Sequence, residues 1–326
     1  MKKSDGSWDK FDDYVIDFAL DSVRKGERIA LVTLVKIEGS SPRSLGAQMT
    51  VSENGEWVGY LSGGCLERAI VEQALLAIKE GTNRIIRYGR GSKFIDIQLP
   101  CGGAIEFSFD VGITEEDLAL VDARLHSRQC ASMKVSGNAN GVELTNIVRQ
   151  YQPRRRLLVA GIGPAAIQLV KLGETHGFET ALFSPDLPTR EEAIGNGVMT
   201  SPMNGVGSIP DFKADNRTAI VLMFHDHEWE RTLIPAALET NAFYIGAMGS
   251  RRTHRERIKY LTELGHDPVK LSRIRGPAGI FSGAKSAPDI ALSILAEIVQ
   301  MERGNNIPDV IFTDYDAVFA CSKDSA

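Results

Sequence analysis

The chain has 326 residues, of which 43% are hydrophobic and 24% charged, and its net charge is -5. These values are those of an ordinary globular protein, and the length predicts two domains. The acidic balance excludes a general affinity for nucleic acid or anionic membrane, and no apolar run reaches the roughly 20 residues of a membrane-spanning helix. The N-terminus lacks a secretory signal and the four cysteines form no CxxC pair, so we expect a cytoplasmic protein.

Residues 1–149 carry a mixed α/β pattern that predicts the first domain. Apolar residues recur at helical spacing in 9–25, 66–79 and 114–127, and strand-like runs occupy 29–37, 48–52, 56–61, 84–88, 94–99 and 104–109, with a hairpin in 131–148. Thr114 and Asp117 have the spacing of a helix-capping pair. The polar stretch that starts at residue 150 is interpreted as the linker into a second domain, residues 150–326.

The second domain alternates strands and helices, which predicts a Rossmann-type, doubly wound parallel sheet. Its first strand, 157–160, is followed by Gly161-Ile162-Gly163-Pro164-Ala165-Ala166. A GxGxxA turn of this kind lets Gly161, Gly163 and Ala166 bring a helix N-terminus close to a phosphate. An α/β turn without a nucleotide remains an alternative. The second strand ends at Ser184 rather than at an acid, which argues against NAD.

Two further clusters follow strands of the second domain. One cluster follows the apolar run 219–224, where the crevice of a Rossmann-type sheet is expected, and consists of His225, Asp226, His227 and Glu228. These residues are interpreted as an acid/base group, as a pair of metal ligands, or as a turn without a function. Zinc would need further ligands that the sequence does not place nearby.

Gly249-Ser250-Arg251-Arg252 follows the run 243–245 and puts two cations at a helix start. That arrangement favours a bound anion, although pairing with surface acids would also satisfy it.

Two cysteines of the first domain neighbour glycine pairs. They lie in Ser62-Gly63-Gly64-Cys65, directly before a helix, and in Pro100-Cys101-Gly102-Gly103. Glycine lets a backbone approach a ligand closely, and a helix N-terminus favours a thiolate. Taken singly, each cysteine would be interpreted as structural. Together with the loop Gly39-Ser40-Ser41-Pro42-Arg43, the two cysteine turns indicate a shared pocket. In that pocket, Gly63 and Gly64 are expected to form an anion-binding turn, or anion cradle.

Long blocks of this sequence resemble the XdhC/CoxI family, the accessory factors of xanthine dehydrogenase. The blocks are Gly39-Ser40-Ser41-Pro42-Arg43, Gly59 to Glu67, Leu99 to Gly103, Tyr244 to Thr253, and Gly276-Pro277 through Gly283-Ala284 to Ser293-Ile294-Leu295-Ala296-Glu297-Ile298. They are ordered along both domains, so the resemblance covers nearly the whole chain.

The resemblance implies a molybdenum-cofactor chaperone that need not turn over a substrate. Such a protein binds the cofactor, as molybdopterin or its cytidine dinucleotide, and protects it during sulfuration by a cysteine desulfurase. It then delivers the cofactor to a xanthine dehydrogenase or aldehyde oxidase-type molybdoenzyme. The implied cofactor-binding residues are Ser41, Arg43, Ser62, Gly63, Gly64, Cys65, Cys101, Gly102 and Gly103, with Cys65 and Cys101 near molybdenum.

In the second domain the candidate nucleotide-binding residues are Gly161, Gly163, Ala166, His225, Gly249, Ser250, Arg251 and Arg252. A homodimer is expected because most soluble oligomers have twofold symmetry. Two alternatives stay open. One is an NAD(P)-dependent oxidoreductase with His225 or His227 as acid/base. The other is a non-catalytic scaffold that recruits the desulfurase or the target enzyme.

Overall fold

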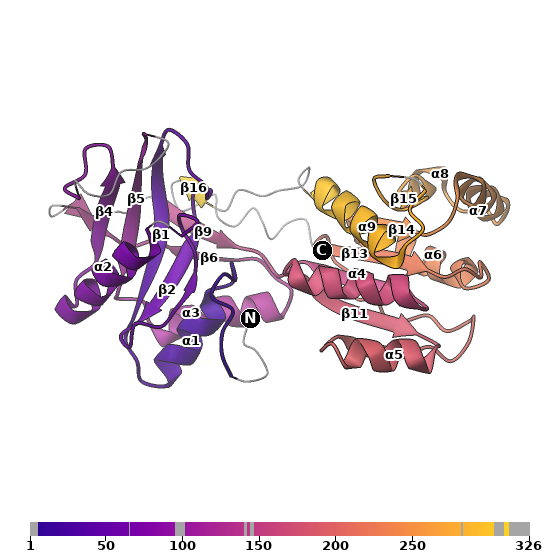
Figure 1. Cartoon of the computed structure of the whole chain (residues 1–326), viewed down its shortest axis with the longest axis horizontal. Coiled ribbons are helices and arrows are strands. Elements are labelled where there is room, and N and C mark those ends of the chain that lie inside the picture. The colour runs from indigo at the N-terminus through magenta and orange to yellow at the C-terminus, as the bar shows by residue number, and fades with distance from the viewer. Residues whose placement is uncertain are drawn as a thin grey trace. The chain divides into compact units, whose positions relative to one another are not determined.

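The computed structural model describes residues 6–64, 66–94, 102–139, 142–143, 147–281, 283–302 and 310–312. The chain forms two compact units, one of residues 1–153 with 307–326 and one of residues 154–306 (Figure 1). Within the described residues, no helix is long and apolar enough to cross a membrane.

The first unit is built on an antiparallel sheet with the strand order β3-β2-β1-β5-β4. Its strands are β1 (Ile29–Glu38), β2 (Gln48–Ser52), β3 (Trp57–Gly59), β4 (Arg84–Gly89) and β5 (Ala104–Asp110). Alternate side chains of β1 point to opposite faces. One set packs against α2 (Glu67–Glu80), and the other against α1 (Ile16–Arg24) and α3 (Glu115–His126).

The helix expected from residue 9 begins only at Ile16. The side chains of Asp9 and Asp12 accept hydrogen bonds from the amides of Phe11 and Tyr14, and such local bonds compete with helix formation. The capping pair of α3 is confirmed, because Thr114 and Asp117 bond reciprocally. The strand expected at 94–99 lies outside the described residues except for Phe94.

A second, smaller sheet completes the first unit. It has the order β16-β9-β6, in which β9 (Ile147–Tyr151) pairs antiparallel with both β6 (Ala131–Lys134) and β16 (Val310–Phe312). A short hairpin of β7 (Asn138–Ala139) and β8 (Val142–Glu143) lies between β6 and β9 in the chain. A strand near the C-terminus of the chain therefore belongs to the first unit.

The second unit has a parallel sheet with the order β12-β11-β10-β13-β14-β15. Its strands are β10 (Arg156–Gly161), β11 (Glu179–Ser184), β12 (Met199–Pro202), β13 (Thr218–Met223), β14 (Tyr244–Ala247) and β15 (Ile274–Arg275). Numbered by appearance, this is the Rossmann order 3-2-1-4-5-6, which reverses between β10 and β13. The predicted Rossmann-type sheet is confirmed.

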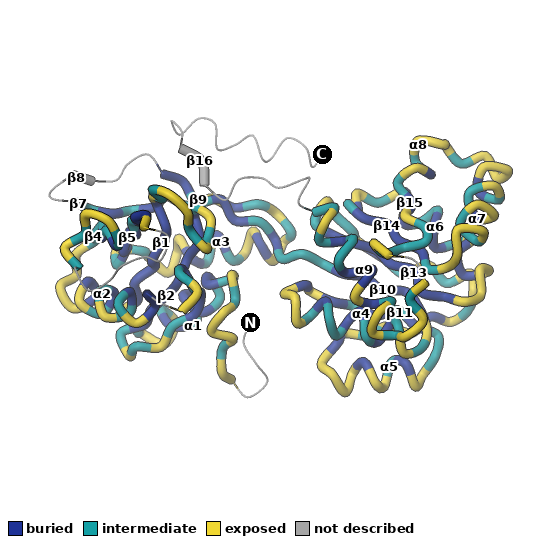
Figure 2. Tube along the Cα trace, turned by 45° about the horizontal axis from the view of Figure 1, so that its top comes forward, coloured by how far each residue is buried: buried dark blue, intermediate teal, exposed yellow. Residues whose placement is uncertain are grey.

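Helices cover both faces of the parallel sheet. Helices α4 (Pro164–Thr175), α5 (Leu187–Ile194) and α9 (Ala287–Glu302) pack on one face, and α6 (Glu230–Leu238), α7 (Arg251–Glu263) and α8 (Pro268–Leu271) on the other. The central strands are buried along their length (Figure 2). A strand buried on both faces has a near-continuous apolar sequence, as 219–224 has.

Candidate functional site

Two of the three turns singled out in the first unit meet at one end of its main sheet. Glu38, the last residue of β1, pairs with Ala104, the first residue of β5. Directly beyond this pair, a Cβ atom on Gly39 would lie 3.3 Å from the Cα of Gly103, and Gly39 has a φ of +91°. Glycine is required there because both the contact and the left-handed backbone disfavour a side chain. The loop 39–43 is thereby placed against Gly102 and Gly103.

Arg43 connects the loop 39–43 to Tyr60, which precedes the third turn by two residues. Its Nη1 donates to the hydroxyl of Tyr60 over 2.7 Å, and its guanidinium lies 4.0 Å from the centre of the Tyr60 ring. Its Nη2 pairs with Asp13, and its backbone amide donates to Ser41 Oγ over 3.3 Å. The Nε–H of Arg43 is buried and has no hydrogen-bond partner among the described residues. Buried donors are normally paired, so this donor stands out among the described polar groups of the unit.

The Ser62–Gly64 turn binds an anion that the chain itself supplies. Glu67 Oε1 accepts from the amides of Leu61 and Ser62 over 3.2 and 2.8 Å. Glu67 Oε2 accepts from Ser62 Oγ over 2.7 Å and from the Gly64 amide over 2.9 Å. Burial raises the pKa of Glu67, but the hydrogen bonds from Ser62 and the turn outweigh it and hold the pKa below 4.5. The expected anion cradle is therefore filled by a carboxylate.

The two cysteines predicted to lie near molybdenum, Cys65 and Cys101, fall outside the described residues. Their neighbours Gly64 and Gly102 are described, and both have positive φ angles, +111° and +64°. Among the described residues no group of three or more histidine, cysteine, aspartate or glutamate side chains is arranged to hold a metal ion.

In the second unit, the glycine turn after β10 has the Rossmann geometry. A Cβ on Gly161 would lie 2.7 Å from the carbonyl oxygen of Met223, so only glycine fits where β10 ends beside β13. Gly163 has a φ of +85° and precedes α4, whose first residue is Pro164. Ala166 is fully buried in the contact between α4 and the sheet. These are the roles expected of the GxGxxA residues.

The polar groups beside this turn bond to one another. The amide of Gly163 donates to Thr189 Oγ1 over 3.0 Å, and the Thr189 hydroxyl and amide donate to Asp186. These bonds from Thr189 hold the pKa of Asp186 below its usual value. Asp186 thus caps α5, while Ser184 at the end of β11 is fully buried. The acid that follows the end of β11, Asp186, is thus engaged in this cap through its Oδ2 atom.

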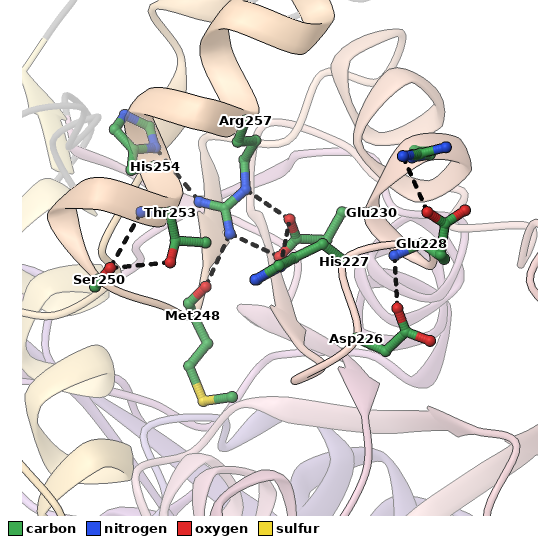
Figure 3. Close-up of polar contacts among 10 residues, drawn as sticks. Asp226, His227, Glu228, Glu230, Met248, Ser250, Thr253, His254 and Arg257 are labelled. Carbon is green, nitrogen blue, oxygen red and sulfur yellow. Dashed lines mark hydrogen bonds and ion pairs between the residues drawn. The ribbon is translucent and has the colours of Figure 1, made fainter.

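The carboxyl ends of β13 and β14 are linked by a buried ion pair (Figure 3). Glu230, at the start of α6, binds Arg257 of α7 through two hydrogen bonds of 2.7 and 2.8 Å. Arg257 also donates to the carbonyl of Met248 over 2.8 Å. His227 Nδ1 lies 3.2 Å from Glu230 Oε2. His225 is exposed and has no hydrogen bond or ion pair among the described residues.

The two arginines after Gly249 lie at the surface. Ser250 caps α7 by accepting from the amide of Thr253 over 3.1 Å. Arg252 pairs with Glu256 over 2.8 Å, which is the surface pairing considered as an alternative to a bound anion. Arg251 is exposed and has no such partner among the described residues.

The fold and its turns define a class of protein, in which a mixed α/β unit with converging glycine turns accompanies a Rossmann unit. Residues 157–298 match the XdhC Rossmann domain, and residues 22–89 match the XdhC and CoxI family. A similarity that extends further along the chain is to the molybdenum cofactor insertion chaperone PaoD of Escherichia coli K12. The two are 34% identical over 298 residues, covering 88% of this chain and 87% of PaoD. The chain belongs to the XdhC/CoxI family.

Two more distant similarities are to Bacillus proteins. A protein of Bacillus subtilis described as a probable xanthine dehydrogenase component is 25% identical over 325 residues, covering 85% of this chain and 94% of that protein. A crystal structure described as a xanthine dehydrogenase from Bacillus halodurans superposes with a TM-score of 0.72 at 21% identity, covering 89% and 96% of the two chains. The second similarity shows that the fold is shared.

Sequence reasoning missed the residues that hold these turns. Glu67 stands three positions after Gly64, the spacing at which a first-turn carboxylate reaches back to the preceding amides, and this signal was available. The partners Glu230 and Arg257 are 27 residues apart on different helices, and no local pattern joins them. Thr189 likewise meets Gly163 only through the packing of α5 beside α4.

Proposed function

We propose that this protein is a molybdenum cofactor insertion chaperone serving a xanthine dehydrogenase or aldehyde oxidase-type molybdoenzyme. The observation that carries the proposal is the 34% identity with PaoD over 88% of the chain. In this proposal the protein works in the cytoplasm as a homodimer and protects the cofactor while a cysteine desulfurase sulfurates it. The cofactor then passes to the target enzyme.

The end of the main sheet in the first unit fits the cofactor. Molybdopterin carries a phosphate and polar pterin edges, and the buried, cationic Nε–H of Arg43 has no acceptor within the part of the chain that the structure describes. Ser41, Arg43, Gly102 and Gly103 would hold the cofactor there, because the glycine backbones admit a close approach. The bound group supplies the molybdenum and dithiolene chemistry of the target enzyme. Cys101, next to Gly102 in sequence, and Cys65, next to Gly64, are the proposed neighbours of the metal.

The Rossmann unit is the proposed site for a nucleotide. The crevice at the β10–β13 reversal is where ligands bind in open parallel sheets. In this chain, the turn of Gly161 and Gly163 lies at that reversal, with the loops of His225 and Ser250 at the same edge of the sheet.

The test is to produce the protein in cells with and without molybdate, denature it, and assay the oxidised pterin by fluorescence together with molybdenum content. Stoichiometric pterin supports the proposal. No pterin, under conditions in which a control molybdoenzyme is loaded, overturns it.

A variant connects cofactor retention to Arg43. Arg43→Lys keeps the positive charge but removes the Nε–H, and it should retain at most one tenth of the pterin. Arg28→Lys is the matched control, because Arg28 forms an exposed pair with Glu53 elsewhere in the same unit. An equal amount of pterin in both variants would show that Arg43 does not contribute to cofactor retention.

A further inference from the structure

Three neighbouring strands of the first unit end at the same level of its main sheet. Ala104, the first residue of β5, pairs with Glu38 of β1 on one side and with Gly89 of β4 on the other. Directly after β4, the amide of Arg90 donates to the carbonyl of Gly103 over 3.0 Å. The turn after β4 is therefore bonded to one of the two glycine turns that meet at the proposed cofactor site.

The side chain of Arg87, on β4, binds all three strand ends. Its Nη1 donates to Glu38 Oε1 over 2.9 Å and to Glu106 Oε1 over 2.8 Å, and its Nη2 donates to Glu38 Oε2. Its Nε donates to the carbonyl of Arg90 over 2.9 Å. One guanidinium thereby connects the last residue of β1, a residue of β5 and the turn after β4.

The charges around Arg87 balance one another. Lys36 lies 3.2 Å from Glu38 and 3.5 Å from Glu106, so two cations face two carboxylates. Hydrogen bonds from Arg87 and Lys36 lower the pKa of Glu38 to about 2, so this carboxylate stays ionised at neutral pH. The four side chains together have no net charge with which to attract an anion. Their bonds hold the ends of the strands instead.

Arg87 and Arg43 use their donors differently. An arginine side chain has five N–H groups. Four of those of Arg87 are used in the bonds to Glu38, Glu106 and Arg90. The buried Nε–H of Arg43, in contrast, has no acceptor among the described residues. Arg43 is therefore the arginine with a donor for a ligand, whereas Arg87 acts on the backbone around it.

We propose that Arg87 is the positioning residue of the cofactor site in the first unit, because it fixes the backbone at Gly39 and Gly103. Gly39 follows Glu38 directly, and Gly103 is held through Arg90. This inference rests on the proposed function, since the site that Arg87 positions is the one proposed for the cofactor. Lysine cannot replace Arg87, because an ammonium group is a compact point charge and lacks the planar fork that reaches several acceptors at once.

Cofactor binding is tested on the full chain, produced without molybdate. The protein is titrated anaerobically with molybdopterin released from a molybdoenzyme, and the bound pterin is oxidised and measured by fluorescence. Arg87→Lys should bind about tenfold more weakly than the wild type, because charged hydrogen bonds are lost. Arg84→Lys is the matched control, since Arg84 lies on the same strand but pairs with an exposed glutamate, Glu80. Wild-type binding by Arg87→Lys would overturn the inference.

The backbone is tested without a ligand by amide hydrogen exchange, measured by NMR. The amide of Arg90 should exchange about tenfold faster in Arg87→Lys than in the wild type, because its bond to Gly103 opens more often. The rate should be unchanged in Arg84→Lys. An unchanged rate in Arg87→Lys would overturn the inference, whatever the result of the titration.

Chemical rescue separates positioning from general stability. Arg87→Ala removes the guanidinium and should lose pterin binding, and millimolar guanidinium chloride should restore part of it, whereas sodium chloride should not. Guanidinium weakens folded proteins in general, so a variant that had only lost stability would bind less pterin in its presence. Failure of guanidinium to restore any binding to folded Arg87→Ala would overturn the inference. Arg87→Lys decides the matter if Arg87→Ala does not fold.

The failure of this inference can be distinguished from the failure of the proposed function. Pterin binding by the wild type that Arg87→Lys leaves unchanged would overturn the role of Arg87 and leave the chaperone proposal standing. No pterin binding by the wild type, under conditions in which a control molybdoenzyme takes up the same cofactor, would overturn both.

Discussion

Replacement of Glu67 by glutamine should destabilise the first unit through the Ser62–Gly64 turn. The carboxylate accepts four hydrogen bonds, two at each oxygen, and glutamine has only one acceptor oxygen. In either orientation of the amide, at least one backbone N–H therefore loses its acceptor. An unsatisfied donor in this partly buried turn costs up to about 3 kcal/mol, and the lost charge adds to this. We expect a total of about 3 kcal/mol.

For a unit of this size, about 3 kcal/mol corresponds to a decrease of roughly 6–12 °C in melting temperature. Circular dichroism melting of the full chain measures it, with Glu72→Gln as the control. Glu72 lies on the same helix but is exposed. If Glu67→Gln and Glu72→Gln melted together, the reasoning that the turn depends on this carboxylate would be refuted.

A second variant identifies the turn as an anion site in its own right. Glu67→Ala removes the carboxylate and leaves the amides of Leu61, Ser62 and Gly64 without an acceptor. Added formate should then restore part of the lost melting temperature, whereas chloride at the same ionic strength should not. Rescue by neither salt would mean that the turn rearranges once Glu67 is removed.

Three further changes test the second unit. Glu230→Gln leaves Arg257 buried without its charge partner and should cost about 3–5 kcal/mol in urea unfolding; a loss below 1 kcal/mol, far under that ~3–5, would contradict the pairing. Burial and the nearby Arg257 hold the pKa of His254 below 6.5, so the unfolded state gains protons first and stability should fall as the pH drops below about 6.5. His254→Gln should reduce that pH dependence, and an unchanged profile would refute the assignment. Thr189→Val removes the acceptor of the Gly163 amide and should cost about 1–2 kcal/mol, measured in the same way; wild-type stability would show the bond to be dispensable.

The parallel sheet was predictable because its signals are local. A strand buried on both faces has a continuous apolar sequence, and Gly161 and Gly163 mark the turn that follows the first strand. The start of α1 was less predictable, since the apolar spacing continues back to residue 9 while the side chains of Asp9 and Asp12 bond to the backbone. Helical periodicity does not report such competition.

The candidate site also has parts that the sequence predicts and parts that it does not. Glycines 39 and 103 were recognisable as places of close backbone approach, although only the pairing of β1 with β5 brings them together. The anion cradle was recognised by its glycines, but its occupant, Glu67, was not. Long-range pairs such as Glu230 with Arg257 depend on helix packing, for which a single sequence provides no signal.

Strand β16 joins the first unit after the chain has passed through the whole of the second. The Rossmann unit is thus an insertion between two strands that are neighbours in one sheet, β9 and β16. By their position in the sequence, the last twenty or so residues would be assigned to the second unit. Their removal would instead leave one edge of β9, in the first unit, without its partner strand. Shortened or fused versions of this protein should therefore keep the C-terminus of the chain if the N-terminal unit is to be studied intact.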